Sequence, residues 1–219
     1  MNIVQEIMKM VDHSLLSPGL TDQALEEGCL TAAKYHTASV CVKPYHVRKA
    51  FQLLRDTDVA VGGVVGFPHG NSATKIKQAE TLQILEDGAV EVDMVINIGK
   101  ALGHDWRYVA EEIQSLTQIT HDQNAIIKVI FENDLLPDDE IKIKLCKICS
   151  EIGVDFVKTS TGYNYVKDPD GKYNYQGATL HDLALMVQHT SPQVQVKAAG
   201  NSGSLDAVLK LREIGVTRT

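Results

Sequence analysis

Residues 150–159 read SEIGVDFVKT, in which the end of a helical pattern runs through a glycine directly into a short apolar strand pattern. The same order recurs in EDGAVEVDMV at 86–95 and in REIGVTRT at 212–219. In each copy the glycine stands where a helix ends and the chain reverses, a position that favours the left-handed backbone conformation. The copies therefore predict repeated helix–strand units, each with a glycine closing the helix. These glycines are Gly88, Gly153 and Gly215.

Eight short runs rich in β-branched residues are spaced along the chain, with a helical pattern between each run and the next. Such alternation predicts parallel strands joined by helices. No glycine-rich dinucleotide-binding loop follows the first run, which favours a closed barrel over an open sheet. We therefore expect an α/β fold, a (β/α)8 TIM barrel in which residues 1–219 form one domain and no eighth helix pattern follows the last run. The runs begin at Val11, Ser39, Val61, Glu91, Ile126, Phe156, Val194 and Val216.

The composition excludes several classes of partner. The net charge of −7 and the pI of about 5.6 argue against nucleic acid, which needs a concentrated basic surface. No run of 18 apolar residues is present, so we expect no membrane partner, and the first residues lack the features of a signal peptide. A cytoplasmic protein that acts on a small molecule is the expectation.

Four cysteines fit reduced thiols in such a compartment, and two of them raise an alternative. Cys146 and Cys149 form a C-x-x-C pair, a spacing used by metal and redox sites. They fall on the apolar face of a helical pattern, with no second cysteine pair and no histidine close by in the sequence. We therefore expect both thiols to pack in the core, with a metal or redox site as the alternative.

Four charged residues interrupt the fourth to seventh apolar strand patterns: Asp93, Lys128, Lys158 and Lys197. Charged side chains are rarely buried without a partner, and barrel active sites lie at the carboxyl ends of the strands. Lys158 and Lys197 are on neighbouring strands, so two ammonium groups are expected to meet in a poorly solvated space. Like charge and desolvation each lower the pKa of a lysine, and the neutral amine attacks carbonyl carbon.

These features predict a lysine Schiff-base enzyme with Lys158 as nucleophile and Asp93 moving protons, directly or through a water. Lys128 would hold Asp93 ionised or contact a substrate hydroxyl. Two structural alternatives remain: lysines that extend to solvent, and a plain Asp93–Lys128 ion pair. Asp12 is expected to orient a substrate hydroxyl or a water, and His69 to cap the following helix. No metal site is expected, because the histidines show no paired ligand spacing.

The ordered motifs VDHSLLSP, ASVCVKP, VVGFPHG, EVDMVINIG, IKVIFE, DFVKTSTGY and VQVKAAG extend over nearly the whole chain. With them the chain resembles the deoxyribose-phosphate aldolase family of class I, Schiff-base aldolases. The resemblance implies a carbon–carbon lyase that reversibly cleaves 2-deoxyribose 5-phosphate to glyceraldehyde 3-phosphate and acetaldehyde. It implies no metal or organic cofactor, and a phosphorylated sugar and an aldehyde as partners. Separately from the resemblance, a homodimer is the expected assembly.

The resemblance also implies roles for individual residues. Lys158 matches the Schiff-base lysine, Lys197 the lysine that perturbs it, and Asp93 the proton-transfer aspartate. Positions that bind substrate are matched by Asp12, Cys41, Lys128, Thr161, Gly162, Gly200 and Asn201.

Three departures from the family pattern leave alternatives open. Asn201 and the residues after it replace a glycine-rich turn, the final helix is missing, and an extended loop lies between Gly162 and Gly177. The first two affect regions that hold phosphate, so we expect weakened phosphate binding with the lysine chemistry intact. The alternatives are an impaired relative with a binding or structural role, and a Schiff-base aldolase for an unphosphorylated sugar or aldehyde.

Overall fold

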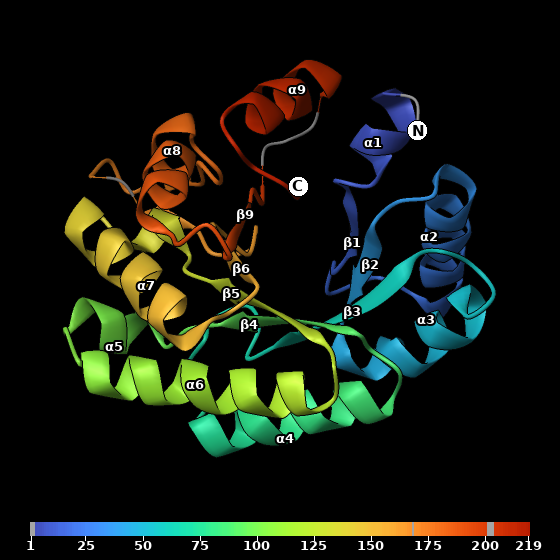
Figure 1. Ribbon diagram of the computed structural model, residues 1–219, viewed down its shortest axis with the longest axis horizontal. Helices are drawn as coiled ribbons and strands as arrows, with labels where there is room; N and C mark the ends of the chain where they lie inside the picture. The colour runs from blue at the N-terminus through green and yellow to red at the C-terminus, as the bar shows by residue number, and fades with distance from the viewer. Residues whose placement is uncertain (1–2, 168, 201–203) are drawn as a thin grey trace.

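The computed structural model describes residues 3–167, 169–200 and 204–219. Their main feature is a seven-stranded parallel sheet that is curled on itself, with helices outside it (Figure 1). In sheet order the strands are β1 (Asp12–Leu15), β2 (Ser39–Val42), β3 (Ala60–Val65), β4 (Glu91–Val95), β5 (Ile126–Ile130), β6 (Phe156–Lys158) and β9 (Gln195–Lys197). The helices are α1 (Ile3–Met8), α2 (Asp22–Tyr35), α3 (Val47–Leu54), α4 (Thr74–Glu86), α5 (Ile98–Leu102), α6 (Trp106–Asp122), α7 (Asp139–Ile152), α8 (Leu180–His189) and α9 (Leu205–Glu213), with 3-10 turns η1 (Pro44–His46) and η2 (Asn133–Leu135).

The segment after α9 closes this sheet between β9 and β1. On the β9 side the N–H of Ala198 donates to the carbonyl of Arg218 at 2.9 Å, and on the β1 side the N–H of Asp12 donates to the carbonyl of Thr219 at 2.9 Å. The predicted barrel is therefore confirmed. Its eighth strand is shorter than predicted, because it pairs with β9 through a single bridge between Lys197 and Arg218.

The glycines that close helices follow the sequence prediction. The backbone φ is +102° at Gly88, +80° at Gly153 and +97° at Gly215, which confirms the three predicted left-handed glycines. At the helix starts, the Thr21 and Ser204 side chains each accept a hydrogen bond from a backbone N–H of the first turn of α2 and α9.

The strand side chains alternate between two environments. On β4, Val92 and Met94 face outward and join the large apolar cluster that packs the sheet against the helices. Glu91 and Asp93, which alternate with them, are buried in the interior of the barrel. Cys41 belongs to a separate small apolar cluster. The barrel interior is thus where charged side chains collect.

The C-x-x-C pair lies on α7 and is part of the outer apolar layer. Cys146 and Cys149 are both fully buried and free, and they contact the main core cluster. Burial raises the pKa of the Cys146 thiol to about 12 and that of Cys149 well above its usual range. The packing interpretation is therefore confirmed, because thiols held protonated make poor metal ligands and nucleophiles. Among the described helices, none has both the length and the apolar character needed to cross a membrane.

Two loops at the carboxyl ends of strands differ from the sequence-based expectation. The prediction that His69 caps α4 is wrong, because the residue at the cap is Ala73, which has no side-chain acceptor, and His69 lies exposed in the loop. The loop after β6 contains a small antiparallel hairpin of β7 (Val166–Lys167) and β8 (Tyr173–Asn174). Strands of two residues have too few side chains to show a period in the sequence.

Candidate active site

The four charged residues predicted at the strand ends are buried together inside the barrel. The exposed fraction is 3% for Lys158, 2% for Lys197 and zero for Asp93 and Lys128. Asp93 on β4 is in register with Lys128 on β5, and Lys158 on β6 is in register with Lys197 on β9. The alternative in which these lysines extend to solvent is therefore wrong.

Asp93 joins all three lysines. Its Oδ2 accepts a hydrogen bond from Lys158 Nζ at 2.6 Å and lies 3.3 Å from Lys197 Nζ. Its Oδ1 lies 3.1 Å from Lys128 Nζ. Two ammonium groups thus share a single carboxylate oxygen, so the Asp93–Lys128 contact is part of a larger network and not a plain ion pair.

Lys128 holds the carboxylates of this network together. Besides Asp93 it contacts Asp12 Oδ2 at 3.0 Å and Glu91 Oε2 at 2.5 Å. Burial acts to lower the pKa of Lys128, but these carboxylates outweigh it and the pKa is raised well above its usual range. For Asp93, burial acts in the opposite sense, yet the lysines hold its pKa well below the usual value. Lys128 therefore keeps Asp93 ionised; its contact with a substrate hydroxyl stays a prediction.

Two members of the network, Arg218 and Glu91, were not predicted from the sequence. Arg218, in the closing segment, contacts Glu91 at 2.9 Å and also binds Asp12. Asp12 in turn accepts a hydrogen bond from Lys197 at 2.5 Å. The charges at the base of the site are therefore linked across the barrel interior, from Asp12 on β1 through Arg218 of the closing segment to Glu91 on β4.

The balance of charge singles out Lys158. The network contains four cations and three carboxylates, and Lys158 contacts only one carboxylate, which it shares with Lys197. Burial lowers the pKa of Lys158, and the like charge of Lys197 adds to this, while Asp93 opposes it. For Lys197, burial acts to lower the pKa, but Asp12 and Asp93 outweigh it and the net shift is upward. Lys158 is thus the amine that gives up its proton most readily.

A pocket of about 450 Å³ borders this network. Lys158 and Lys197 line it together with four predicted substrate-binding residues: Asp12, Thr161, Gly162 and Gly200. Three further predicted residues, Cys41, Asp93 and Lys128, are fully buried and do not line this pocket. Asn201 lies outside the described residues. The pocket therefore gives a small molecule access to the amine with the lowered pKa.

Residues 6–205 match the model of the DeoC/LacD family of aldolases. The chain belongs to this family. The deoxyribose-phosphate aldolase of Rhodopirellula baltica is 46% identical over 213 residues, covering 97% of this chain and 84% of that protein. A deoxyribose-phosphate aldolase of Clostridium kluyveri is 41% identical over 216 residues, covering 98% of this chain and 93% of the relative. The protein is accordingly an aldolase, a carbon–carbon lyase.

Solved structures resemble this aldolase closely in fold. A crystal structure of a putative deoxyribose-phosphate aldolase from Coccidioides immitis superimposes with a TM-score of 0.89 at 31% identity, covering 99% of this chain and 82% of that one. A tetrameric deoxyribose phosphate aldolase from Aeropyrum pernix gives a TM-score of 0.84 at 27% identity, covering 98% and 86%. The TIM-barrel assignment is consistent with both.

In this DeoC/LacD aldolase, Glu132 shapes the turn that follows the Lys158 strand. Glu132 is fully buried just after β5, with φ +63°. Its carboxylate accepts hydrogen bonds from the N–H and hydroxyl of Thr161 and, at 2.7 Å, from the side chain of Asn164. Burial raises its pKa. Sequence reasoning missed this role, although an acidic residue at the end of the apolar run IIKVIFE was a signal.

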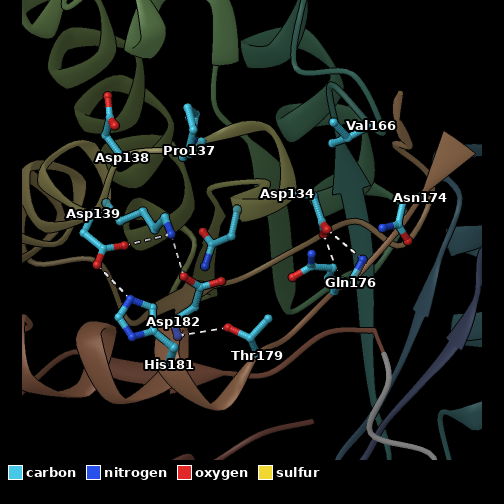
Figure 2. Close-up of a pocket in the computed structure, with 14 residues that line it drawn as sticks. Asp134, Pro137, Asp138, Asp139, Val166, Asn174, Gln176, Thr179, His181 and Asp182 are labelled. Atoms are coloured by element: carbon cyan, nitrogen blue, oxygen red, sulfur yellow. Dashed lines mark hydrogen bonds and ion pairs between the residues drawn. The ribbon is translucent and has the colours of Figure 1, made fainter. Parts of the chain in front are cut away.

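A larger pocket of about 910 Å³ lies beside the barrel of the aldolase, between η2, α7 and α8 (Figure 2). Asp139, His181 and Asp182 have potential ligand atoms within 4.8 Å of one another there. Lys142 already contacts Asp139 at 3.1 Å and Asp182 at 2.6 Å; Figure 2 labels the two aspartates. Its ammonium supplies the countercharge that a metal ion would supply, so this cluster is a poor metal site. The expectation that catalysis needs no metal stays a prediction.

Proposed function

We propose that this chain is a deoxyribose-phosphate aldolase, acting as one catalytic domain on 2-deoxyribose 5-phosphate with Lys158 as the Schiff-base nucleophile. One observation carries the proposal. The Lys158 amine lies 2.6 Å from Asp93 and lines a substrate-sized pocket, and burial beside Lys197 lowers its pKa. A neutral amine at neutral pH is the requirement for attack on an aldehyde.

The proposed reaction begins on the open-chain sugar. The neutral Lys158 amine adds to the aldehyde carbon, and loss of water from the resulting carbinolamine gives an iminium. When the C3 hydroxyl loses its proton, the C2–C3 bond breaks and its electron pair moves to the iminium, which becomes an enamine. Glyceraldehyde 3-phosphate leaves; protonation of the enamine at C2 and hydrolysis then release acetaldehyde and restore the amine. The iminium is the electron sink, so we propose no metal or organic cofactor.

Asp93 and Lys197 are the residues that we propose transfer protons during this reaction. Asp93 accepts a hydrogen bond from the Lys158 nitrogen, which is the geometry needed to receive its proton as the carbinolamine forms. Its low pKa makes it a weak base while three lysines surround it. Conversion of Lys158 to an iminium and enamine changes that balance during the cycle, so we propose that Asp93 exchanges protons with the pocket through Lys197 or a water.

The phosphate is proposed to bind at the wall of the same pocket that Gly162 and Gly200 form. Gly162 and Gly200 line it and follow the two active-site lysines in sequence by a few residues. Both have positive φ, at +84° and +77°. Glycines in this conformation allow the backbone to approach an anion closely. Thr161 and Asn201 belong with them to the proposed substrate-binding set, as do Asp12, Cys41 and Lys128.

We further propose that the enzyme works in the cytoplasm and assembles as a homodimer. The free, buried cysteines support a reducing compartment. For assembly, the homodimer is the expectation stated from the sequence, whereas the Aeropyrum pernix relative is described as a tetramer. Size-exclusion chromatography with light scattering tests it, and a mass other than twice that of the chain rejects it.

Borohydride trapping with acetaldehyde tests the nucleophile. The expected product carries an ethyl group on the Lys158 nitrogen, mapped by peptide mass spectrometry, and Lys158→Ala abolishes it. Lys167→Ala, which removes an exposed lysine of the neighbouring hairpin, is the matched control and leaves trapping intact. An adduct on another lysine rejects the assignment.

Turnover separates the proposal from its alternatives. Cleavage of deoxyribose 5-phosphate with a much higher kcat/KM than of deoxyribose supports it. Equal values for the two sugars favour the unphosphorylated substrate, and trapping without turnover of either favours the impaired relative.

A further inference from the structure

The hairpin between Gly162 and Gly177 brings a tyrosine into the active-site pocket. Tyr173 on β8 points away from the barrel and is 72% exposed. Tyr175, two residues later, lines the pocket that also contains Lys158. The loop that the sequence marks as a departure from the family pattern thus contributes directly to the walls of the site.

The hydroxyl of Tyr175 lies against glycine backbone. A Cβ added to Gly200 would overlap it, and a Cβ added to Gly177 or Gly162 would lie 3.1 Å or 3.6 Å from it. All three glycines have positive φ. The missing side chains leave room for the hydroxyl at the wall formed by Gly162 and Gly200, which is the wall proposed above to receive the phosphate.

This hydroxyl has no hydrogen-bond partner among the described residues, although it is buried. Buried tyrosine hydroxyls usually find a partner, because leaving one unpaired costs free energy. Burial, with the Glu132 and Asp134 carboxylates, acts to raise the pKa of Tyr175. The Ser160 hydroxyl, also without a hydrogen-bond partner by distance and angle, lies close enough to act in the opposite sense. Burial outweighs Ser160 and raises the pKa of Tyr175 above its usual range. Tyr175 therefore offers a proton for hydrogen bonding throughout the neutral range.

The loop holds Tyr175 in place before any ligand binds. Asp134 accepts hydrogen bonds from the backbone N–H groups of Gln176 at 2.7 Å and Gly177 at 3.0 Å; Figure 2 labels Asp134 and Gln176. The Tyr165 ring packs against Tyr175 with its edge, at a centroid distance of 5.9 Å. A donor fixed in advance binds its ligand at a lower entropic cost.

We propose that the Tyr175 hydroxyl donates a hydrogen bond to the phosphate of the bound sugar and is a specificity-determining residue of this aldolase. This rests on the proposed function, since it takes Lys158 as the site of the aldehyde. Gly162 and Gly200 come after the lysines at the carboxyl ends of β6 and β9, so Tyr175 meets the end of the substrate remote from the aldehyde. The carboxylates of Glu132 and Asp134 lie nearby but already accept hydrogen bonds from other groups of the protein, and neither is bonded to the Tyr175 hydroxyl.

The test compares Tyr175→Phe with Tyr173→Phe, which removes an exposed hydroxyl from the same hairpin. For Tyr175→Phe, kcat/KM for deoxyribose 5-phosphate falls roughly 10- to 100-fold, the range for losing a hydrogen bond to a charged group. The change lies mainly in KM, kcat/KM for deoxyribose stays as in the wild type, and Tm does not fall, because no protein partner is lost. Tyr173→Phe changes none of these values.

Three outcomes overturn the proposal: an equal loss on both sugars, improved use of the phosphorylated sugar, or a fall in Tm that reveals a bond to Ser160. Calorimetric binding of inorganic phosphate gives a measurement that needs no turnover. Its Kd rises about tenfold in Tyr175→Phe; an unchanged Kd also overturns the proposal. Acetaldehyde trapping on Lys158 contains no phosphate, so its failure in the wild type rejects the Schiff-base function separately.

Discussion

Replacing Lys197 by methionine tests whether its charge keeps the neighbouring amine neutral. Lys158 and Lys197 both contact Oδ2 of Asp93, so their nitrogens lie within about 6 Å of each other. At about 5 Å and an effective dielectric constant of about 20, Coulomb's law gives about 3 kcal/mol of repulsion. This corresponds to roughly a 100-fold change in the protonation equilibrium of Lys158. The substitution also leaves Asp93 with one cation fewer, which shifts the equilibrium in the same direction.

The rate of borohydride trapping with acetaldehyde, followed over a range of pH, measures this effect. Only the neutral amine reacts, so trapping rises as the pH approaches the Lys158 pKa from below. In Lys197→Met that rise moves to higher pH, trapping at neutral pH falls roughly 100-fold, and raising the pH restores it. Lys197→Arg is the matched control, because it keeps the positive charge and therefore retains the profile at lower pH. Equal profiles for Lys197→Met and the wild type would refute the electrostatic reasoning.

Three further outcomes are expected. Lys128→Met leaves three carboxylates short of a buried partner and lowers the free energy of unfolding by about 3–5 kcal/mol in urea titrations; a loss comparable to that of an exposed lysine would contradict this. Asp12 and Asp93 have lowered pKa values, so the stability that they contribute is fully present above their unfolded values near 4 and is lost as the pH falls below that range; a Tm that is flat between about pH 4 and 2 would argue against it. Cys149→Ala lowers the free energy of unfolding by about 1–2 kcal/mol without changing kcat/KM, whereas a loss of activity at full stability would revive a redox or metal role.

The sequence predicted the strands and the charged residues on them because both signals are local. Asp93 and Lys128 interrupt apolar runs, and a run of alternating burial determines which face each residue occupies. The left-handed turn at Gly153 follows in the same way from its position between a helix pattern and a strand pattern.

The rest of the network depends on closure of the sheet, which no local pattern reveals. Arg218 and Glu91 are far apart in the chain and meet only because the closing segment joins β9 to β1. Glu91 stands first in its strand, where an acidic residue ordinarily reaches solvent. Glu132 and Tyr175 were missed for a related reason, since their roles depend on turns whose geometry is determined by contacts with other strands.

The closing segment ties assembly of the barrel to its chemistry. The same few residues join the first and last strands by backbone hydrogen bonds and, through Arg218, neutralise Asp12 and Glu91. Without Arg218 the same interior would hold three cations and three carboxylates in place of four and three, so less positive charge would oppose protonation of Lys158. Contacts of the closing segment therefore both complete the sheet and favour the neutral form of the Lys158 amine.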